Sequence, residues 1–192
     1  MTEHSAGLRR FLSLLADFRQ MTSLALKGVL VGPAIAAMAR LAPPPEYSVT
    51  SATVLVQFAS IIWLFQFSPV NNQSKLQRQM KRAAVVFVVC AIVCFFLTEQ
   101  FTVSIGHSRK RVVIGWKVRP EVQAITTPAY TAFDALRGYE YDADRVWTTG
   151  SIMVMWVALV LTWMLTFAAL TMYIGYFILL QSVIPQVNQE KS

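Results

Sequence analysis

Charged residues are scarce in this chain. Its 192 residues include 17 Lys and Arg and 10 Asp and Glu, so only 14% carry a charged side chain. A water-soluble domain has about 25% charged residues, whereas here 55% of the residues are hydrophobic and the mean hydropathy is +0.49. This composition excludes an ordinary soluble globule and predicts a protein whose main solvent is a lipid bilayer.

The residues that build metal and catalytic sites are also few. Cys90 and Cys94 are four positions apart on one helical face with no His nearby, an arrangement that suits neither a metal site nor a disulfide. The chain has no glycine-rich phosphate loop, no HExxH motif and no pair of His suited to haem. Ser151 lacks the context of a nucleophile elbow. We therefore predict a non-enzymatic protein without cofactor or metal, in which both cysteines are small buried apolar residues.

Four apolar stretches are present, at 24–41, 52–67, 83–98 and 152–180. The last is uncharged and longer than the about 20 residues that cross a bilayer, and Pro185 is its predicted end. The second and third are predicted to form a helical hairpin about the polar segment 70–82. The first crosses only if Lys27 and Arg40, at its ends, extend their charges to the membrane surface.

The excess of positive charge lies in two short segments, 1–27 and 70–82. Basic residues beside apolar stretches favour the cytoplasmic side, so four crossings place both termini and 70–82 in the cytoplasm and 99–148 outside. The alternative has three crossings, with 24–41 on the cytoplasmic surface and 99–148 inside. No aromatic residues alternate with the basic ones, which argues against nucleic acid as a partner. The predicted cytoplasmic anchors are Arg9, Arg10, Lys75, Arg78, Lys81 and Arg82.

Residues 1–22 have apolar side chains at helical spacing with basic and polar residues on the other face. They predict an amphipathic helix that lies on the anionic cytoplasmic leaflet or packs on a soluble cytoplasmic partner. The run Ala37-Met38-Ala39 resembles a signal-peptide cleavage site. Because the region before it is long and itself amphipathic, we expect the segment to be retained.

The polar segment 99–148 predicts a small, partly β region. Residues 101–105 and 112–118 are β-rich and predict a hairpin, and 129–137 predict a short helix ended by Gly138. A two-stranded hairpin is marginal alone in water, so we expect it to pack on the helix ends, on a second copy or on a partner. The predicted tip contains His107, Arg109, Lys110 and Arg111; a solvated turn is the favoured interpretation, and an anion-binding or pH-sensing tip is the alternative.

Polar and small residues mark the helix faces that should pack together. An unpaired amide is costly in hydrocarbon, so Gln57 is expected to hydrogen-bond another helix, within the bundle or across a subunit interface; a pore-lining role is the alternative. Small residues at four-residue spacing allow close helix packing, within the chain or between copies. The interface or pore-lining candidates are Thr53, Gln57, Ser60, Gly28, Gly32, Ala158, Thr162, Thr166 and Gly175.

The sequence therefore predicts an all-α membrane protein, a bundle of four transmembrane helices with a small, partly β extracytoplasmic segment between the third and fourth. The expected parts are an amphipathic cytoplasmic or interfacial helix, three crossings with the basic loop 70–82, the extracytoplasmic segment, and a long fourth crossing with a short cytoplasmic tail. They occupy residues 1–22, 23–98, 99–148 and 149–192.

Two function classes fit this outline. The favoured one is a polytopic inner-membrane protein that self-associates and acts as a pore-forming, channel-like or membrane-disrupting effector controlled by a partner. The alternative is an accessory or scaffolding subunit of a larger secretion, transport or respiratory assembly. The crossings contain no Asp or Glu and the two halves of the chain show no repeat, which argues against an ion-coupled transporter.

Overall fold

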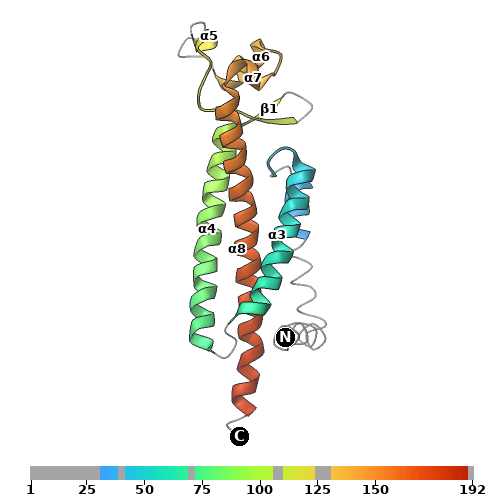
Figure 1. Cartoon of the computed structure of the whole chain (residues 1–192), viewed down its shortest axis with the longest axis vertical. Coiled ribbons are helices and arrows are strands. Elements are labelled where there is room, and N and C mark those ends of the chain that lie inside the picture. Colours follow the sequence, from blue (N-terminus) through green and yellow to red (C-terminus); the bar gives the residue numbers. More distant parts are fainter. Residues whose placement is uncertain (1–30, 39–41, 69–71, 106–109, 124–130, 190–192) are drawn as a thin grey trace, which may run out of the picture.

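The computed structural model describes residues 31–38, 42–68, 72–105, 110–123 and 131–189. These residues form a bundle of long helices with a small domain at one end (Figure 1). We call that small domain, formed by the described residues within 102–148, the cap. The amphipathic helix predicted for 1–22 lies outside the described residues.

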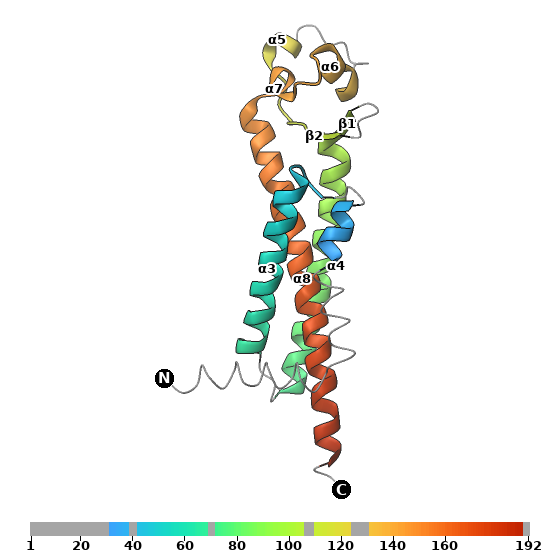
Figure 2. The same ribbon diagram turned by 90° about the vertical axis from the view of Figure 1, so that its right-hand side faces the viewer.

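Three helices of the described chain are long and apolar enough to cross a membrane. They are α3 (Glu46–Phe67), α4 (Gln73–Phe101) and α8 (Thr149–Gln189). The helix α8 packs on both α3 and α4, and both views show it between them (Figures 1 and 2). The predicted crossings 52–67, 83–98 and 152–180 are therefore confirmed as helices suited to a bilayer. The helix α8 continues past Pro185, which sequence analysis took as its end.

The predicted loop 70–82 is wrong over most of its length, because α4 already begins at Gln73. The Asn72 side chain accepts a hydrogen bond from the Lys75 backbone N–H at 3.1 Å, which satisfies a donor at the start of the helix. Gln, Lys and Arg are good helix formers, so the polar segment extends the helix instead of interrupting it. Leu76, fully buried, packs near Leu64 and Leu179 and fixes this first turn against α3 and α8.

The first predicted crossing, 24–41, is described only at 31–38 and is helical there. This helical piece lies beside the bundle (Figure 2). Ala36 and Ala37 pack against a buried cluster that includes Cys94 of α4 and Trp163 of α8. The described residues thus contain three candidate crossings and one short helical segment, and four complete crossings are not established by them.

The cap begins with an antiparallel hairpin of β1 (Thr102–Ile105) and β2 (Lys110–Val113), in which Thr102 is opposite Val113. The hairpin was predicted, but its second strand is displaced from the predicted 112–118. The same pairing register extends one residue beyond the strands, because the Ile114 backbone N–H donates to the Phe101 carbonyl at 2.9 Å. Gly115 then lies against the first turn of α8.

Three short helices complete the cap: α5 (Pro120–Gln123), α6 (Ala132–Gly138) and α7 (Ala143–Val146). The helix predicted at 129–137 is confirmed as α6, which begins where Thr131 and Asp134 form a capping box. The helix α7 begins at an Asp142 cap, because the Asp142 side chain accepts a hydrogen bond from the Asp144 backbone N–H.

The cap has its own hydrophobic core. Phe101 of α4 and Ile152 of α8 pack against this core. The prediction that the hairpin packs on the helix ends is therefore confirmed, and the cap is anchored to both helices at once. The buried core residues are Ile114, Val122, Ala135, Leu136, Val146 and Trp147.

Candidate functional site

The polar residue predicted to need a partner finds one inside the chain. The Gln57 amide of α3 donates to the Thr171 hydroxyl of α8 at 3.2 Å, and Thr171 donates to the Phe167 carbonyl at 2.7 Å. Both residues are buried, with Gln57 0% exposed and Thr171 3% exposed. A hydrogen bond between two buried side chains stabilises a helix pair in lipid by about 1 kcal/mol. The hydrogen bond between Gln57 and Thr171 therefore joins α3 to α8.

The hydroxyl side chains on the same predicted face are bonded to their own helices. Thr53 donates to the Val49 carbonyl at 2.7 Å and Ser60 to the Val56 carbonyl at 2.8 Å. On α8, Thr162 and Thr166 donate to the carbonyls four residues earlier, each at 2.7 Å. Local bonds of this kind satisfy a hydroxyl without a solvent partner.

The small residues admit close contacts between helices of this chain. A side-chain Cβ at Gly175 would lie 2.5 Å from the Leu64 side chain, and one at Gly32 would lie 3.4 Å from Phe167. Ala158 is half-buried on α8, and Gly28 lies outside the described residues. Gly175 therefore permits close packing within the chain, which is one of the two roles left open by the sequence, whereas the space at Gly32 would accept a Cβ at ordinary contact distance.

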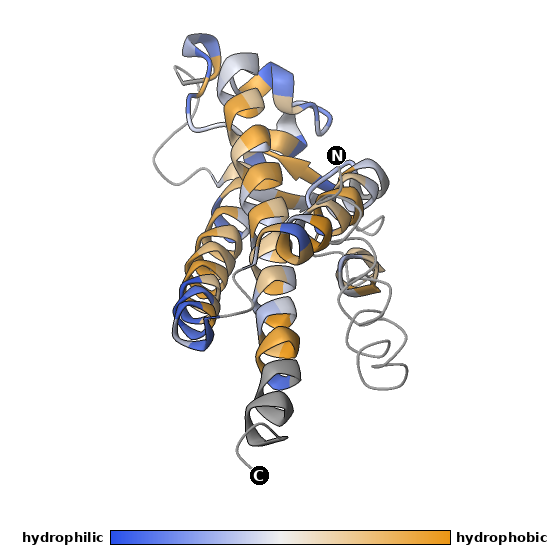
Figure 3. Ribbon diagram, turned by 60° about the horizontal axis from the view of Figure 1, so that its bottom comes forward, coloured by the Kyte–Doolittle hydropathy of each residue, from blue (hydrophilic) through white to orange (hydrophobic). Residues whose placement is uncertain are grey.

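The described helices expose apolar side chains over their middle parts. On α4 the exposed residues include two adjacent pairs of valines, an isoleucine and a phenylalanine, and on α8 four of the exposed side chains recur every four residues. Figure 3 shows the corresponding apolar ribbons. Such faces suit lipid tails or apolar helices of another protein. The exposed residues include Val85, Val86, Val88, Val89, Ile92 and Phe95 on α4, and Met153, Val157, Leu161 and Leu165 on α8.

The basic anchors lie together at the end of α4 that is far from the cap. Lys75, Arg78, Lys81 and Arg82 are all exposed in the first three turns of this helix, and Figure 3 shows that end as hydrophilic. Basic side chains at a helix end suit the headgroup region of a bilayer. Arg9 and Arg10 lie outside the described residues.

The predicted basic tip of the hairpin is only partly described. His107 and Arg109 lie outside the described residues, and Lys110 is described only as a backbone position of β2. Arg111 is half-buried rather than fully solvated as a turn residue would be, because β2 begins at Lys110 and carries Arg111 into the pairing with Ser104. Its Nη1 is enclosed and has no hydrogen-bond partner among the described residues.

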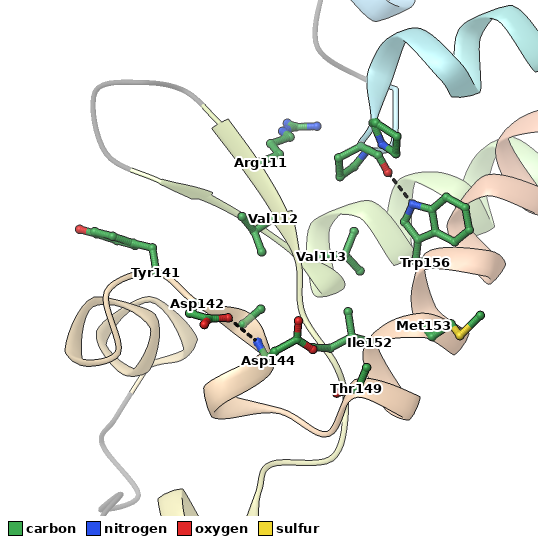
Figure 4. A pocket seen from close by; sticks show the side chains of 13 residues that line it. Arg111, Val112, Val113, Tyr141, Asp142, Asp144, Thr149, Ile152, Met153 and Trp156 are labelled. Carbon is green, nitrogen blue, oxygen red and sulfur yellow. Dashed lines mark hydrogen bonds between the residues drawn. The ribbon is translucent and has the colours of Figure 1, made fainter.

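Arg111 lines a groove of about 770 Å³ between the cap and the helix ends. Figure 4 shows Arg111 and Trp156 on one side of this groove and Asp142 and Asp144 on another. The Trp156 indole N–H donates to the Pro44 carbonyl at 2.5 Å, which ties α8 to the segment that precedes α3. Apolar side chains of β2 and α8 form most of the remaining wall, namely Val112, Val113, Ile152 and Met153. We call this feature the cap groove.

Three residues that shape the cap junction and the helix contacts were not among the predicted site residues. A Cβ on Gly115 would overlap the Ser151 hydroxyl, so Gly115 lets the cap approach α8. Trp156 and Thr171 were not singled out as partners of Pro44 and Gln57. An isolated glycine after a strand was the available signal for Gly115, whereas no local pattern indicates the other two contacts.

The described residues contain no group of three or more His, Cys, Asp and Glu side chains that could hold a metal ion. Comparisons with known proteins add no functional assignment, since no family model, no curated protein and no solved structure matches the chain. The candidate site is therefore defined by geometry alone: the α3–α8 polar contact, the apolar outer faces and the cap groove.

Proposed function

We propose that this protein is a non-enzymatic accessory or scaffolding subunit of a larger membrane assembly, and that it crosses the inner membrane four times. The observation that carries this proposal is the inward orientation of its polar side chains. Gln57 is 0% exposed and bonded to Thr171, while the described outer surface of the crossings is apolar over its middle part. Such a bundle presents a surface to apolar helices or lipid and a cap to a partner outside.

The fourth crossing is supported by the depth at which residues 31–38 pack. Pro33 is fully buried, Gly32 lies beside Phe167, and Ala36 and Ala37 pack against the buried cluster that contains Trp163. Trp163 and Phe167 are near the middle of the apolar part of α8, Thr149–Gln181. A segment confined to the membrane surface would have no reason to contact the middle of a crossing helix. We infer that 24–41 completes a crossing, which places both termini in the cytoplasm and the cap outside.

A self-associating pore was the function that the sequence favoured. A water-filled pore needs polar side chains along a face that copies of the chain could turn towards one another. The polar candidates Thr53, Thr162 and Thr166 instead bond to their own helices. These local hydrogen bonds give more support to a scaffolding role than to a pore. A pore remains the alternative result of the experiment described next.

Expression of the full chain with an affinity tag in its native host tests the proposal. We expect a stable set of membrane proteins to purify with it, and we expect the chain expressed alone to leave the membrane potential unchanged. The variant Ile92→Trp, which alters the exposed face of α4, should weaken co-purification, whereas Arg137→Gln on the exposed surface of α6 should not. Loss of membrane potential together with a closed ring of copies in detergent would instead establish the pore.

A further inference from the structure

The cap groove lies at the level where α8 leaves the apolar bundle. Its wall includes Thr149, Ile152, Met153 and Trp156 from the first two turns of α8 and Pro44 from the segment before α3. The four α8 residues lie at the start of the helix stretch suited to hydrocarbon, which begins at Thr149. The groove is therefore open to the boundary between lipid tails and headgroups on the cap side. This location does not depend on the function proposed above.

The groove holds one available positive charge and one available negative charge. Arg111 Nη1 is enclosed without a hydrogen-bond partner among the described residues. Asp142 is already used, since it accepts from the Asp144 backbone N–H at 3.1 Å and pairs with Arg145 at 3.3 Å. The Asp144 carboxylate makes no ion pair with any described residue. An enclosed charge without a counter-charge is costly, so Arg111 favours an anionic group in the groove. Asp144 is exposed and offers an acceptor to a cationic group, so a ligand that carries both signs complements this groove.

An apolar stripe continues from the groove along α8. Met153, which lines the groove, is 65% exposed. Val157, Leu161 and Leu165 follow at four-residue spacing and are 37%, 53% and 53% exposed. At about 1.5 Å per residue the stripe from 153 to 165 is about 18 Å long, comparable with one leaflet of a hydrocarbon core about 30 Å thick. The stripe thus offers an acyl chain a continuous apolar surface below the groove.

We propose that the cap groove binds one zwitterionic phospholipid of the cap-side leaflet. Arg111 binds its phosphate, Asp144 accepts hydrogen bonds from its ammonium group, and one acyl chain lies along the stripe that starts at Met153. Figure 4 shows Arg111 and Asp144 on different sides of the groove, so the phosphate and the ammonium group would each meet a separate side chain. A peptide fits less well, because the mainly apolar wall would leave its backbone groups without partners.

The test uses the purified, delipidated full chain in mild detergent and native mass spectrometry to count bound lipid. Phosphatidylethanolamine is the probe, and phosphatidylcholine and phosphatidylglycerol are the comparison lipids. We expect one phosphatidylethanolamine per chain, bound about tenfold more tightly than phosphatidylcholine, whose quaternary ammonium cannot donate a hydrogen bond. Phosphatidylglycerol, which lacks an amine, should also bind more weakly than phosphatidylethanolamine.

Two variants separate the headgroup contacts. Arg111→Gln should weaken all three phospholipids about tenfold. Asp144→Asn should weaken phosphatidylethanolamine by a similar factor and leave phosphatidylglycerol unchanged or tighter. The matched controls Arg137→Gln and Glu121→Gln change exposed charges of the cap outside the groove and should change nothing.

The proposal is overturned if the unaltered chain binds all three headgroups equally, since that pattern describes general solvation by lipid. This comparison needs no substitution, so it decides the matter even if Arg111→Gln does not fold. Unchanged affinities in folded Arg111→Gln and Asp144→Asn proteins would also overturn it. Neither result bears on whether the protein is a scaffolding subunit, which the co-purification experiment tests separately.

Discussion

The cap buries apolar side chains and exposes charged ones, whereas the helix bundle buries polar side chains and exposes apolar ones. In the cap, apolar side chains such as Leu136 and Val146 are buried together, and charged groups such as Arg145 and Asp142 pair at the surface. In the bundle the polar Gln57 and Thr171 are buried, while Ile92 is 64% exposed. The cap is arranged for water and the bundle for hydrocarbon.

This difference indicates where the membrane boundary lies. The change occurs around Phe101 and Thr149, where α4 ends and α8 begins. There the cap core contacts α4 and α8 through Phe101 and Ile152, and the cap groove opens. The two regions share one junction, so each can be perturbed separately or through that junction.

The largest expected effect is a cavity in the bundle. Leu159 is 0% exposed and packs with Val113 and Met155. Leu159→Ala should lower the free energy of unfolding by about 2–5 kcal/mol, measured by denaturant titration in detergent. The control Ile92→Ala removes an exposed side chain and should cost less than about 0.5 kcal/mol. Equal costs would show that the outer face of α4 is buried, and the comparison between the two regions would fail.

A substitution at the junction should have the next largest effect. A Cβ on Gly115 would overlap Ser151 and press on the backbone of Ile152. Overpacking of this kind costs about 1–3 kcal/mol, so Gly115→Ala should increase hydrogen exchange in the cap and in the first turn of α8. At Gly138 a Cβ meets nothing within 4 Å, and Gly138→Ala should leave exchange unchanged. Normal protection in Gly115→Ala would rule out the close approach.

Removal of the buried polar contact should have a smaller effect. Gln57→Leu deletes the 3.2 Å hydrogen bond to Thr171 and should cost about 1 kcal/mol of bundle stability. Gln66→Leu, on the exposed part of α3, is the matched control and should be close to neutral. A double-mutant cycle with Thr171→Val measures the coupling. A coupling energy of zero would show that the two side chains do not interact.

The smallest effect is expected at a turn in the cap. Glu140 has a φ of 56°, a left-handed conformation that costs a residue with a Cβ about 1–2 kcal/mol. Its 3.9 Å pair with Arg145 is exposed and contributes little. Glu140→Gly should therefore raise the melting temperature of the cap slightly, whereas Glu121→Gly, within the helix α5, should lower it. A lower melting temperature for Glu140→Gly would contradict the conformational argument.

The sequence was sufficient to predict the helices that are marked by long apolar stretches or by helix-ending residues. The apolar stretches predicted α3, α4 and α8, and the spacing of Gly138 and its neighbours predicted α6. The cost of an unpaired amide in lipid predicted that Gln57 must bond to another helix. Each of these predictions uses either the apolar requirement of the bilayer or the periodicity of a helix, and both can be recognised within a short stretch of sequence.

The contacts between distant segments were not predictable in the same way. Thr171 and Trp156 find their partners 114 and 112 residues away in sequence, and no local pattern encodes such pairs. The segment 70–82 was expected to be a loop because its charges were read as a loop signal, although Asn72 and the residues after it favour a helix. The position of Arg111 depended on where β2 begins, and the predicted strand 112–118 started two residues later than the observed Lys110.

We propose that the bundle crosses the bilayer an even number of times, with the cap on the opposite side from both ends. The test replaces both native cysteines (Cys90→Ala and Cys94→Ala) and then introduces one cysteine at a time: Ser5→Cys, Glu121→Cys or Ser192→Cys. An impermeant maleimide is added to sealed vesicles of known orientation, and the labelled variant shows which positions face the reagent. We expect Ser5→Cys and Ser192→Cys to be labelled from the cytoplasmic face and Glu121→Cys only from the other. Labelling of the two ends from opposite faces would contradict this account.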